Sequence, residues 1–181
     1  MTKNVLNQNG IKAQEFIDTI ESDFVFGNKP INRLKVMENN KDSLNQNKSN
    51  ELTKLREKIN SIENCNLKNN SRNLVMGDGD INSPLMLIGE APGKIEDSLG
   101  VPFQGDVGSL LNKMLLAINI QIKKVYSTYS VNFRPPEDRK PSSQEIKRYS
   151  IFLKEHISII NPKIVILMGS TAMEAVTNLN S

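Results

Sequence analysis

The chain has very little cysteine and no long apolar run. Its 181 residues include one cysteine, Cys65, which excludes a disulfide framework within the chain and favours a reducing compartment. No apolar stretch approaches the ~20 residues that a membrane-spanning helix needs. Residues 1–10 contain no apolar signal core. We therefore expect a cytoplasmic protein that does not enter a membrane, with one domain and an appendage.

An excess of one charge sign and a set of histidines are also missing. The formal net charge is only +3, which permits a polyanionic partner without indicating one. The single histidine, His156, lies inside a helical pattern between Glu155 and Ile157. We interpret it as a structural residue. The chain also shows no internal repeat.

The composition divides the chain into three parts. Residues 1–35 are predicted to form an N-terminal helical extension. Residues 36–50 are rich in Asn and Lys and nearly free of apolar side chains, which predicts a disordered linker. The apolar spacing across residues 52–62 predicts a helix with Asn50 as its N-cap. Residues 51–181 are then expected to form an α/β domain.

Apolar strands alternate with amphipathic helices in this domain. The expected strands are residues 85–88, 124–131 and 163–168. Helices are expected after each strand, and Ser142 with Glu145 forms a capping-box pattern before the last strand. Such an order predicts a parallel sheet covered on both faces, a three-layer α/β sandwich. Ligands of such sheets bind beyond the carboxyl ends of the strands.

The loop after the first strand, "GEAPGKIEDSLGVPFQG", is unusual for a simple connection. Its glycines let a ligand approach the main chain. Glu90 directly follows the strand, where a carboxylate can hold and activate a water. Phe103 either offers a stacking surface for a planar ligand or lies tucked under the loop. Glu96 and Asp97 could bind a metal, but no His or Cys lies near them, which favours a solvated turn. The glycine spacing matches neither a Walker loop nor a dinucleotide fingerprint.

Three segments in order resemble the type-4 branch of the uracil-DNA glycosylase superfamily. They are "GEAPGKIEDSLGVPFQGDVGSLLNKML", "VYSTYSVNFRPPEDRKPSSQEI" and "INPKIVILMGSTAMEAV", and the resemblance covers about residues 50–178. Residues 12–35 more weakly resemble an N-terminal extension of alphaproteobacterial members. The resemblance implies a sandwich around a parallel sheet. It also implies a DNA-repair hydrolase that flips uracil out of DNA and cleaves its N-glycosidic bond in base excision repair. We expect a monomer with uracil-containing DNA as its partner.

The resemblance also implies roles for individual residues. Glu90 would position or activate the attacking water. The flipped base would stack on Phe103 and meet the backbone of Gly89, Ala91, Pro92 and Gly93 at its edge. Tyr129 stands where the family places an asparagine that reads uracil, which leaves the preferred base open. The candidates for phosphate contacts are Arg134, Arg139 and Lys140.

Many members of this family hold a [4Fe–4S] cluster on four cysteines. Only Cys65 remains here, and Ile62, Phe133 and Tyr149 stand at the other three positions. Because one thiolate cannot hold such a cluster, we expect no cofactor and no metal. We expect the bulky replacements to fill the space as core, with the family's cluster as the alternative.

In members of this family, the segment that resembles residues 160–176 is followed by another strand and a "His-Pro-Ser" loop. The chain is therefore expected to be a C-terminally incomplete member that lacks the last strand and this motif. Two other functions stay open. One is an inactive or non-catalytic member that binds damaged or single-stranded DNA, and the other is an α/β enzyme that acts on a free nucleotide.

Overall fold

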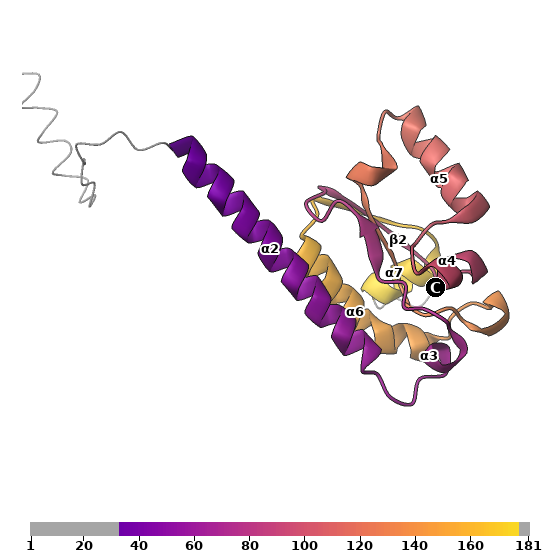
Figure 1. Ribbon diagram of the computed structural model, residues 1–181. Coiled ribbons are helices and arrows are strands. Elements are labelled where there is room, and N and C mark those ends of the chain that lie inside the picture. Colours follow the sequence, from indigo (N-terminus) through magenta and orange to yellow (C-terminus); the bar gives the residue numbers. More distant parts are fainter. Residues whose placement is uncertain (1–32, 178–181) are drawn as a thin grey trace, which may run out of the picture. The chain divides into compact units, whose positions relative to one another are not determined.

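A four-stranded sheet forms the centre of the domain (Figure 1). The computed structural model describes residues 33–177. The strands are β1 (Gly77–Gly79), β2 (Leu85–Gly89), β3 (Tyr126–Tyr129) and β4 (Ile164–Leu167), in the order β1-β3-β2-β4. β2 pairs in parallel with both β3 and β4, whereas β1 pairs antiparallel with β3. The sheet is therefore parallel at its centre and mixed overall.

Helices cover both faces of this sheet. They are α2 (Arg33–Asn60), α3 (Asn66–Asn70), α4 (Lys94–Leu99), α5 (Gly105–Ala117), α6 (Ser143–Ile160) and α7 (Ser170–Thr177), with short 3-10 turns at Ile122–Lys124 and Pro136–Asp138. Side chains alternate between the two faces along a strand. Met86 and Ile88 pack with α6 and α7, while Leu87 packs on the other face with Leu111 and Leu115 of α5. The predicted three-layer α/β sandwich is confirmed.

The predicted strands and the capping box agree with the structure. The ends of β2, β3 and β4 differ from the ends of the expected strands by at most two residues. The Ser142 hydroxyl accepts a hydrogen bond from the Glu145 N–H, and the Glu145 carboxylate accepts one from the Ser142 N–H at 2.7 Å. A hydrogen bond from Arg139 is the main cause that lowers the pKa of Glu145, to about 2. The pair fixes the start of α6 and the loop before it.

The predicted linker over residues 36–50 differs from the structure, because these residues lie inside helix α2. The stretch from residue 31 to residue 60 contains no Gly or Pro, and its Lys, Leu, Glu and Gln residues favour a helix. Asn50 is consequently not an N-cap but an interior residue, whose side-chain oxygen accepts a hydrogen bond from Gln46 at 3.2 Å. The low hydrophobicity of residues 36–50 indicated a linker, whereas their helix propensity and the contacts of Lys48 favour a helix.

The carboxyl-terminal part of helix α2 runs beside α6 in the opposite direction (Figure 1). Lys48 donates hydrogen bonds to the carbonyls of Ile81 and Ile160, at 3.2 and 2.8 Å, and Lys58 forms an ion pair with Glu155. Lys48 thus interacts with the carboxyl end of α6, where a positive charge is favourable. The compact unit that contains the sheet begins at Glu38 rather than at residue 51. The predicted extension at residues 1–35 lies almost entirely outside the described residues.

The packing of His156 is that of a core residue, as predicted. Its side chain is 2 % exposed, and its Nε2 lies 2.8 Å from the hydroxyl of Tyr126 on β3. The two rings meet edge to face with centroids 5.3 Å apart. Burial lowers the pKa of His156 from 6.5 to about 4. The imidazole is therefore neutral in the folded protein over the physiological range.

This burial predicts a loss of stability in mild acid. The unfolded chain protonates His156 below its ordinary pKa of 6.5, whereas the folded protein resists protonation down to about 4. The contribution of His156 is complete above pH 6.5 and falls as the pH drops toward 4, by roughly 3 kcal/mol in total. Urea unfolding followed between pH 7.5 and 4.5 measures it. His156→Gln, which does not titrate, should give a shallower slope, and equal slopes would contradict the assignment.

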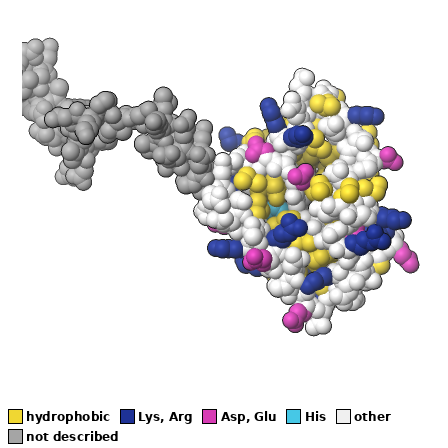
Figure 2. Space-filling model, viewed as in Figure 1, with side chains coloured by type: hydrophobic (Ala, Val, Ile, Leu, Met, Phe, Trp, Pro, Cys, Tyr) yellow, Lys and Arg dark blue, Asp and Glu magenta, His cyan; other side chains and the backbone are white. Residues whose placement is uncertain are grey.

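Apolar side chains remain exposed around β4 and α5. Ile164 and Ile166 of β4 and Val107, Leu110 and Met114 of α5 are each more than two-fifths exposed. Figure 2 shows hydrophobic side chains interspersed with Lys and Arg on the viewed face. None of the helices within residues 33–177 combines the length and the apolar character that crossing a membrane requires.

Candidate functional site

Two loops leave the sheet side by side at the carboxyl ends of β2 and β3. Residues 90–104 follow β2, and residues 130–142 follow β3. The ends of the strands are in register, because Gly89 is the partner of Tyr129. The Gly89 carbonyl also accepts hydrogen bonds from the Ser130 N–H and hydroxyl, both at 2.8 Å. This edge of a parallel sheet is where ligands of α/β proteins bind.

Gly89, Phe103 and Tyr129 meet at this edge. The rings of Phe103 and Tyr129 lie 4.8 Å apart between centroids, at 32° to one another. A Cβ atom on Gly89 would lie 2.8 Å from the Tyr129 ring and 2.9 Å from Phe103. Position 89 therefore needs glycine for packing, since any side chain would displace one of the two rings. Phe103 is only 5 % exposed.

The Tyr129 hydroxyl bridges two parts of the first loop. It accepts a hydrogen bond from the Phe103 N–H at 3.0 Å and donates one to Glu96 Oε1 at 3.4 Å. Burial raises the pKa of Tyr129 well above its ordinary value. The phenol consequently keeps its proton and can donate it to the carboxylate.

Glu96 and Asp97 are buried residues that organise this loop, rather than metal ligands or parts of a solvated turn. Glu96 accepts hydrogen bonds from the N–H groups of Gly93 and Gln104, each at 3.1 Å. Asp97 accepts them from the N–H groups of Arg72 and Asn73, at 2.9 and 3.2 Å. This role could not be predicted from the sequence, because an acidic pair in a polar loop gives no sign that backbone donors surround it.

The backbone at Phe103 is strained. Its φ of +51° lies in the left-handed region, which costs a non-glycine residue about 1–3 kcal/mol and persists only where the surrounding structure imposes it. Helix α5 begins two residues later, and a Cβ on Gly108 of that helix would lie 1.8 Å from the Phe103 carbonyl oxygen. The hydrogen bonds of the loop and the close approach of α5 together hold the ring in place.

The other first-loop candidates lie around this pair of rings. Glu90 is half-buried directly after β2, and Ala91 is half-buried against the cluster of apolar residues beside α2. Pro92 is buried, and Gly93 is the N-cap of α4. Phe103 also lines a cavity of about 400 Å³ with Pro102, Gln104 and residues of β1 and β3. The loop can therefore present backbone, an aromatic ring and one carboxylate at the same strand end.

The basic candidates of the second loop pair with carboxylates. Arg134 donates two hydrogen bonds to Asp138, at 2.6 and 2.8 Å, and Arg139 donates two to Glu145, at 2.8 and 2.7 Å. Lys140 is exposed. Glu137 and Asp138 both have positive φ, 58° and 55°. The loop is thus a constrained turn in which a phosphate would compete with two carboxylates for the arginines.

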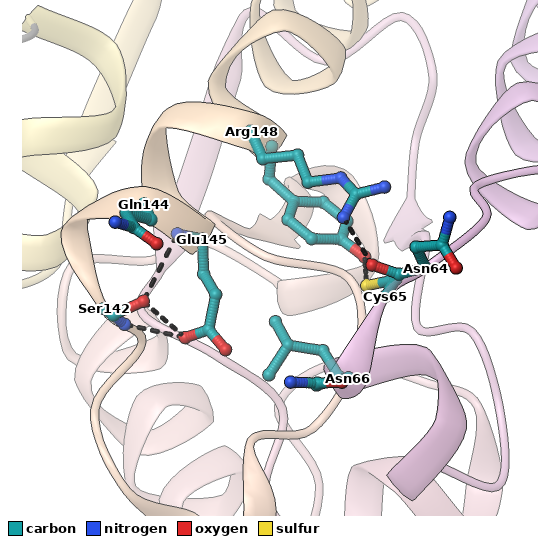
Figure 3. A pocket seen from close by; sticks show the side chains of 9 residues that line it. Asn64, Cys65, Asn66, Ser142, Gln144, Glu145 and Arg148 are labelled. Atoms are coloured by element: carbon teal, nitrogen blue, oxygen red, sulfur yellow. Dashed lines mark hydrogen bonds between the residues drawn. The ribbon is translucent and has the colours of Figure 1, made fainter.

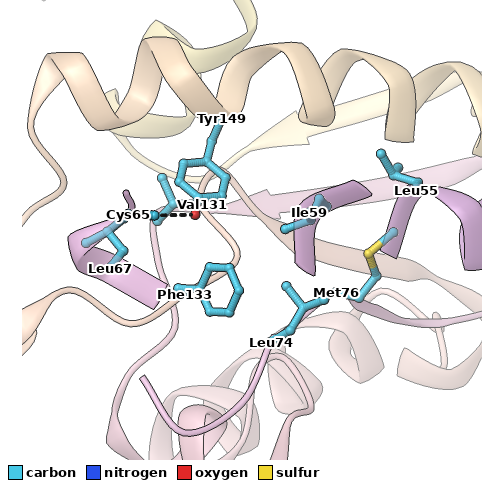
Figure 4. Packing of buried hydrophobic residues seen from close by; sticks show 9 residues of the cluster. All are labelled: Leu55, Ile59, Cys65, Leu67, Leu74, Met76, Val131, Phe133 and Tyr149. Atoms are coloured by element: carbon cyan, nitrogen blue, oxygen red, sulfur yellow. Dashed lines mark hydrogen bonds between the residues drawn. The ribbon is translucent and has the colours of Figure 1, made fainter. Parts of the chain in front are cut away.

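The four positions that correspond to cluster cysteines converge on one apolar cluster, and Figure 4 shows three of them, Cys65, Phe133 and Tyr149. Cys65, Phe133 and Tyr149 are buried there, and Ile62 packs against them. The Cys65 sulfur lies 3.2 Å from the Tyr149 hydroxyl, and the Phe133 and Tyr149 rings meet edge to face. The prediction that these residues fill the space as core is confirmed.

The donor atoms around Cys65 do not fit an iron–sulfur cluster. Such a cluster needs several thiolate ligands, and one thiol with a phenol beside it cannot supply them. Within residues 33–177 no group of three or more His, Cys, Asp or Glu side chains could hold a metal ion.

A polar pocket of about 350 Å³ opens next to Cys65 and Tyr149 (Figure 3). Arg148 lies on its wall and donates hydrogen bonds to the carbonyls of Glu63 and Asn64. Glu145 lies opposite, in its capping contact with Ser142. Both charged side chains of the pocket are therefore already hydrogen-bonded to other groups of the chain.

Known proteins similar in sequence to this chain indicate its family. The family model described as the uracil DNA glycosylase superfamily matches residues 76–181. A type-4 uracil-DNA glycosylase of Thermotoga maritima is 36 % identical over 65 % of this chain and 61 % of its own length. One from Pyrobaculum aerophilum is 34 % identical over 71 % of this chain and 66 % of its own. One from Sulfurisphaera tokodaii is 39 % identical over 65 % and 54 %, respectively. The chain thus spans about three-fifths of the length of the curated relatives it matches.

Proposed function

Because the chain belongs to the uracil-DNA glycosylase superfamily, we propose that it hydrolyses the N-glycosidic bond of uracil in DNA. The observation that carries this proposal is the arrangement at the end of β2, where Glu90 directly follows Gly89 and the Phe103 ring lies so near Gly89 that a Cβ there would be 2.9 Å from it. A base inside duplex DNA cannot reach such a site, so it has to be flipped out of the stack. The activity would serve base excision repair.

Glu90 has the place of the group that handles water. In the proposed reaction a water attacks the sugar carbon, the carbon–nitrogen bond breaks, and uracil leaves with the bonding electrons. A carboxylate beside the reacting sugar can accept the proton of the water. Its negative charge also stabilises the positive charge that develops on the sugar. A half-buried carboxylate at a strand end suits both tasks.

The second loop is the proposed contact with the DNA backbone. Arg134, Arg139 and Lys140 lie on the loop next to the first one, so they could bind phosphates that flank the flipped nucleotide. When a phosphate binds, the two arginines would leave Asp138 and Glu145 or contact both the carboxylate and the phosphate.

We further propose that the protein acts in the cytoplasm as a monomer.

We also propose that the protein works without an iron–sulfur cluster. Anaerobic purification is expected to yield a colourless protein with no stoichiometric iron, because Phe133 and Tyr149 occupy the space and Cys65 is the one thiol there. Iron analysis together with the visible absorption spectrum measures this. About four irons per chain would contradict it.

An alternative function is recognition of damaged or single-stranded DNA without catalysis. The observation that favours it is the contact between Tyr129 and Phe103, which covers the stacking surface. Incubation with an oligonucleotide that contains a single uracil separates the two functions, since only the enzyme leaves an abasic site that alkali cleaves. Binding without an abasic product would favour the alternative. Hydrolysis of free deoxyuridine with no reaction on the oligonucleotide would instead favour a nucleotide enzyme.

A further inference from the structure

We propose that Tyr129 fills the base position of the site with its own ring, so that a flipped base enters only when this side chain swings out. The inference makes Tyr129 a specificity-determining residue, and it rests on the function proposed above. The role inferred for Tyr129 is to determine which ligand enters the site, whereas the role proposed for Glu90 is in the chemical step.

The ring geometry is the first support. Aromatic ring pairs have centroids about 4.5–7 Å apart, and the Phe103 and Tyr129 rings, tilted by 32° to one another, lie at the near end of this range with 4.8 Å between their centroids. A Cβ on Gly89 would lie 2.8 Å from the Tyr129 ring and 2.9 Å from the Phe103 ring, so no room for a further side chain remains between the strand end and the two rings. A planar ligand that stacked on this side of Phe103 would have to occupy the same layer as the Tyr129 ring.

The polar contacts of the hydroxyl are the second support. The Tyr129 oxygen receives the Phe103 N–H and points its own proton at Glu96, a side chain only 6 % exposed. One donor and one acceptor of the pocket are thus satisfied by a single side chain. When the ring swings out, both groups lose this partner and face the vacated space.

These two groups indicate the chemical class of the ligand. A backbone N–H beside a carboxylate oxygen matches a planar ring that carries a carbonyl next to an N–H group. The pyrimidine uracil has such an edge and is about as large as a phenol ring. While the side chain is closed the ligand cannot bind. Its apparent affinity is therefore the affinity of the open site multiplied by the fraction of molecules in which the site is open.

Paired variants at position 129 test the proposal. Tyr129→Ser removes the ring, whereas Tyr129→Phe keeps the ring and removes both hydrogen bonds of the hydroxyl. Binding of 1-methyluracil is measured by NMR titration, with circular dichroism to verify that each variant is folded. We expect Tyr129→Ser to bind at least about tenfold more tightly than the wild type, and Tyr129→Phe to lie between them. The Ser variant should bind 1,3-dimethyluracil, which lacks the N–H group, about tenfold more weakly.

Equal affinity of a folded Tyr129→Ser and the wild type would overturn the proposal. A measurement on the wild type keeps the test valid if that variant does not fold. Nuclear Overhauser contacts between the ring protons of Phe103 and Tyr129 should be present without ligand and disappear when 1-methyluracil is added at high concentration. Their absence from the ligand-free protein would also overturn it.

The same variants are assayed for base release from the uracil-containing oligonucleotide. If Tyr129→Ser gains affinity for 1-methyluracil but releases no base, the pocket inference stands and the glycosylase proposal fails. If the wild type releases uracil rapidly and ring removal changes neither binding nor turnover, the glycosylase proposal stands and the pocket inference fails.

Discussion

Glu90→Gln is expected to lower the rate of uracil release by about 10²–10⁴-fold, the usual contribution of a positioned general base. Glutamine keeps the size of the side chain and its position after β2, but it cannot accept the proton of a water or carry a negative charge. The measurement is single-turnover base release from an oligonucleotide with one uracil. Binding of the same oligonucleotide should change much less than the rate, because the proposed role of Glu90 is in the chemical step.

The matched control for this variant is Glu51→Gln. Glu51 is an exposed glutamate on α2. Its replacement is the same Glu-to-Gln change, made at a position far in sequence from the two loops. Its rate should equal that of the wild type. A Glu90→Gln protein that keeps near-wild-type turnover while remaining folded would remove Glu90 from the mechanism.

Tyr149→Ala is expected to lower the free energy of unfolding by about 3–5 kcal/mol, as for large aromatic side chains in tightly packed cores. Tyr149 is 1 % exposed, and its ring contacts Phe133 and Phe152, with centroids 6.4 and 6.2 Å away. The alanine would leave a cavity at the point where α2, α6 and the segment that contains Cys65 meet. Urea unfolding at pH 7.5 measures the loss.

Tyr149→Phe separates the ring from the hydroxyl. It removes only the contact with the Cys65 sulfur, so we expect a loss of about 1 kcal/mol. A cost below about 1 kcal/mol for Tyr149→Ala would show that the ring does not support the core. The residues at the cluster positions would then need another explanation than the filling of space.

The elements with strong patterns could be predicted from the sequence. Continuous apolar runs located β2 and β4, and the Ser142–Glu145 pair located the start of α6. The replacements at residues 62, 133 and 149 were correctly expected to lie in the core with Cys65. In each case the local pattern and the tertiary environment favour the same structure.

The features that could not be predicted depend on contacts distant in sequence. Strand β1 has the sequence Gly-Asp-Gly, which has no strand propensity, and it forms because β3 offers it hydrogen-bond partners. Glu96 and Asp97 are buried because N–H groups from three segments converge on them. The ring contact and the hydrogen bond between Phe103 and Tyr129 join residues 26 positions apart through a loop whose path the sequence does not reveal.

The contact of Lys48 with Ile160 has a consequence for synthesis of the chain. These residues are 112 positions apart, a longer separation than that between the paired strands β2 and β4. At about 5–20 residues per second, a ribosome needs on the order of 6–20 seconds to make the intervening segment. During this time α2 has neither α6 nor the carbonyl of Ile160 to bind. Its sequence, rich in Asn and Lys, suits this interval, because a nascent helix with few apolar side chains offers little surface for aggregation before its partner is made.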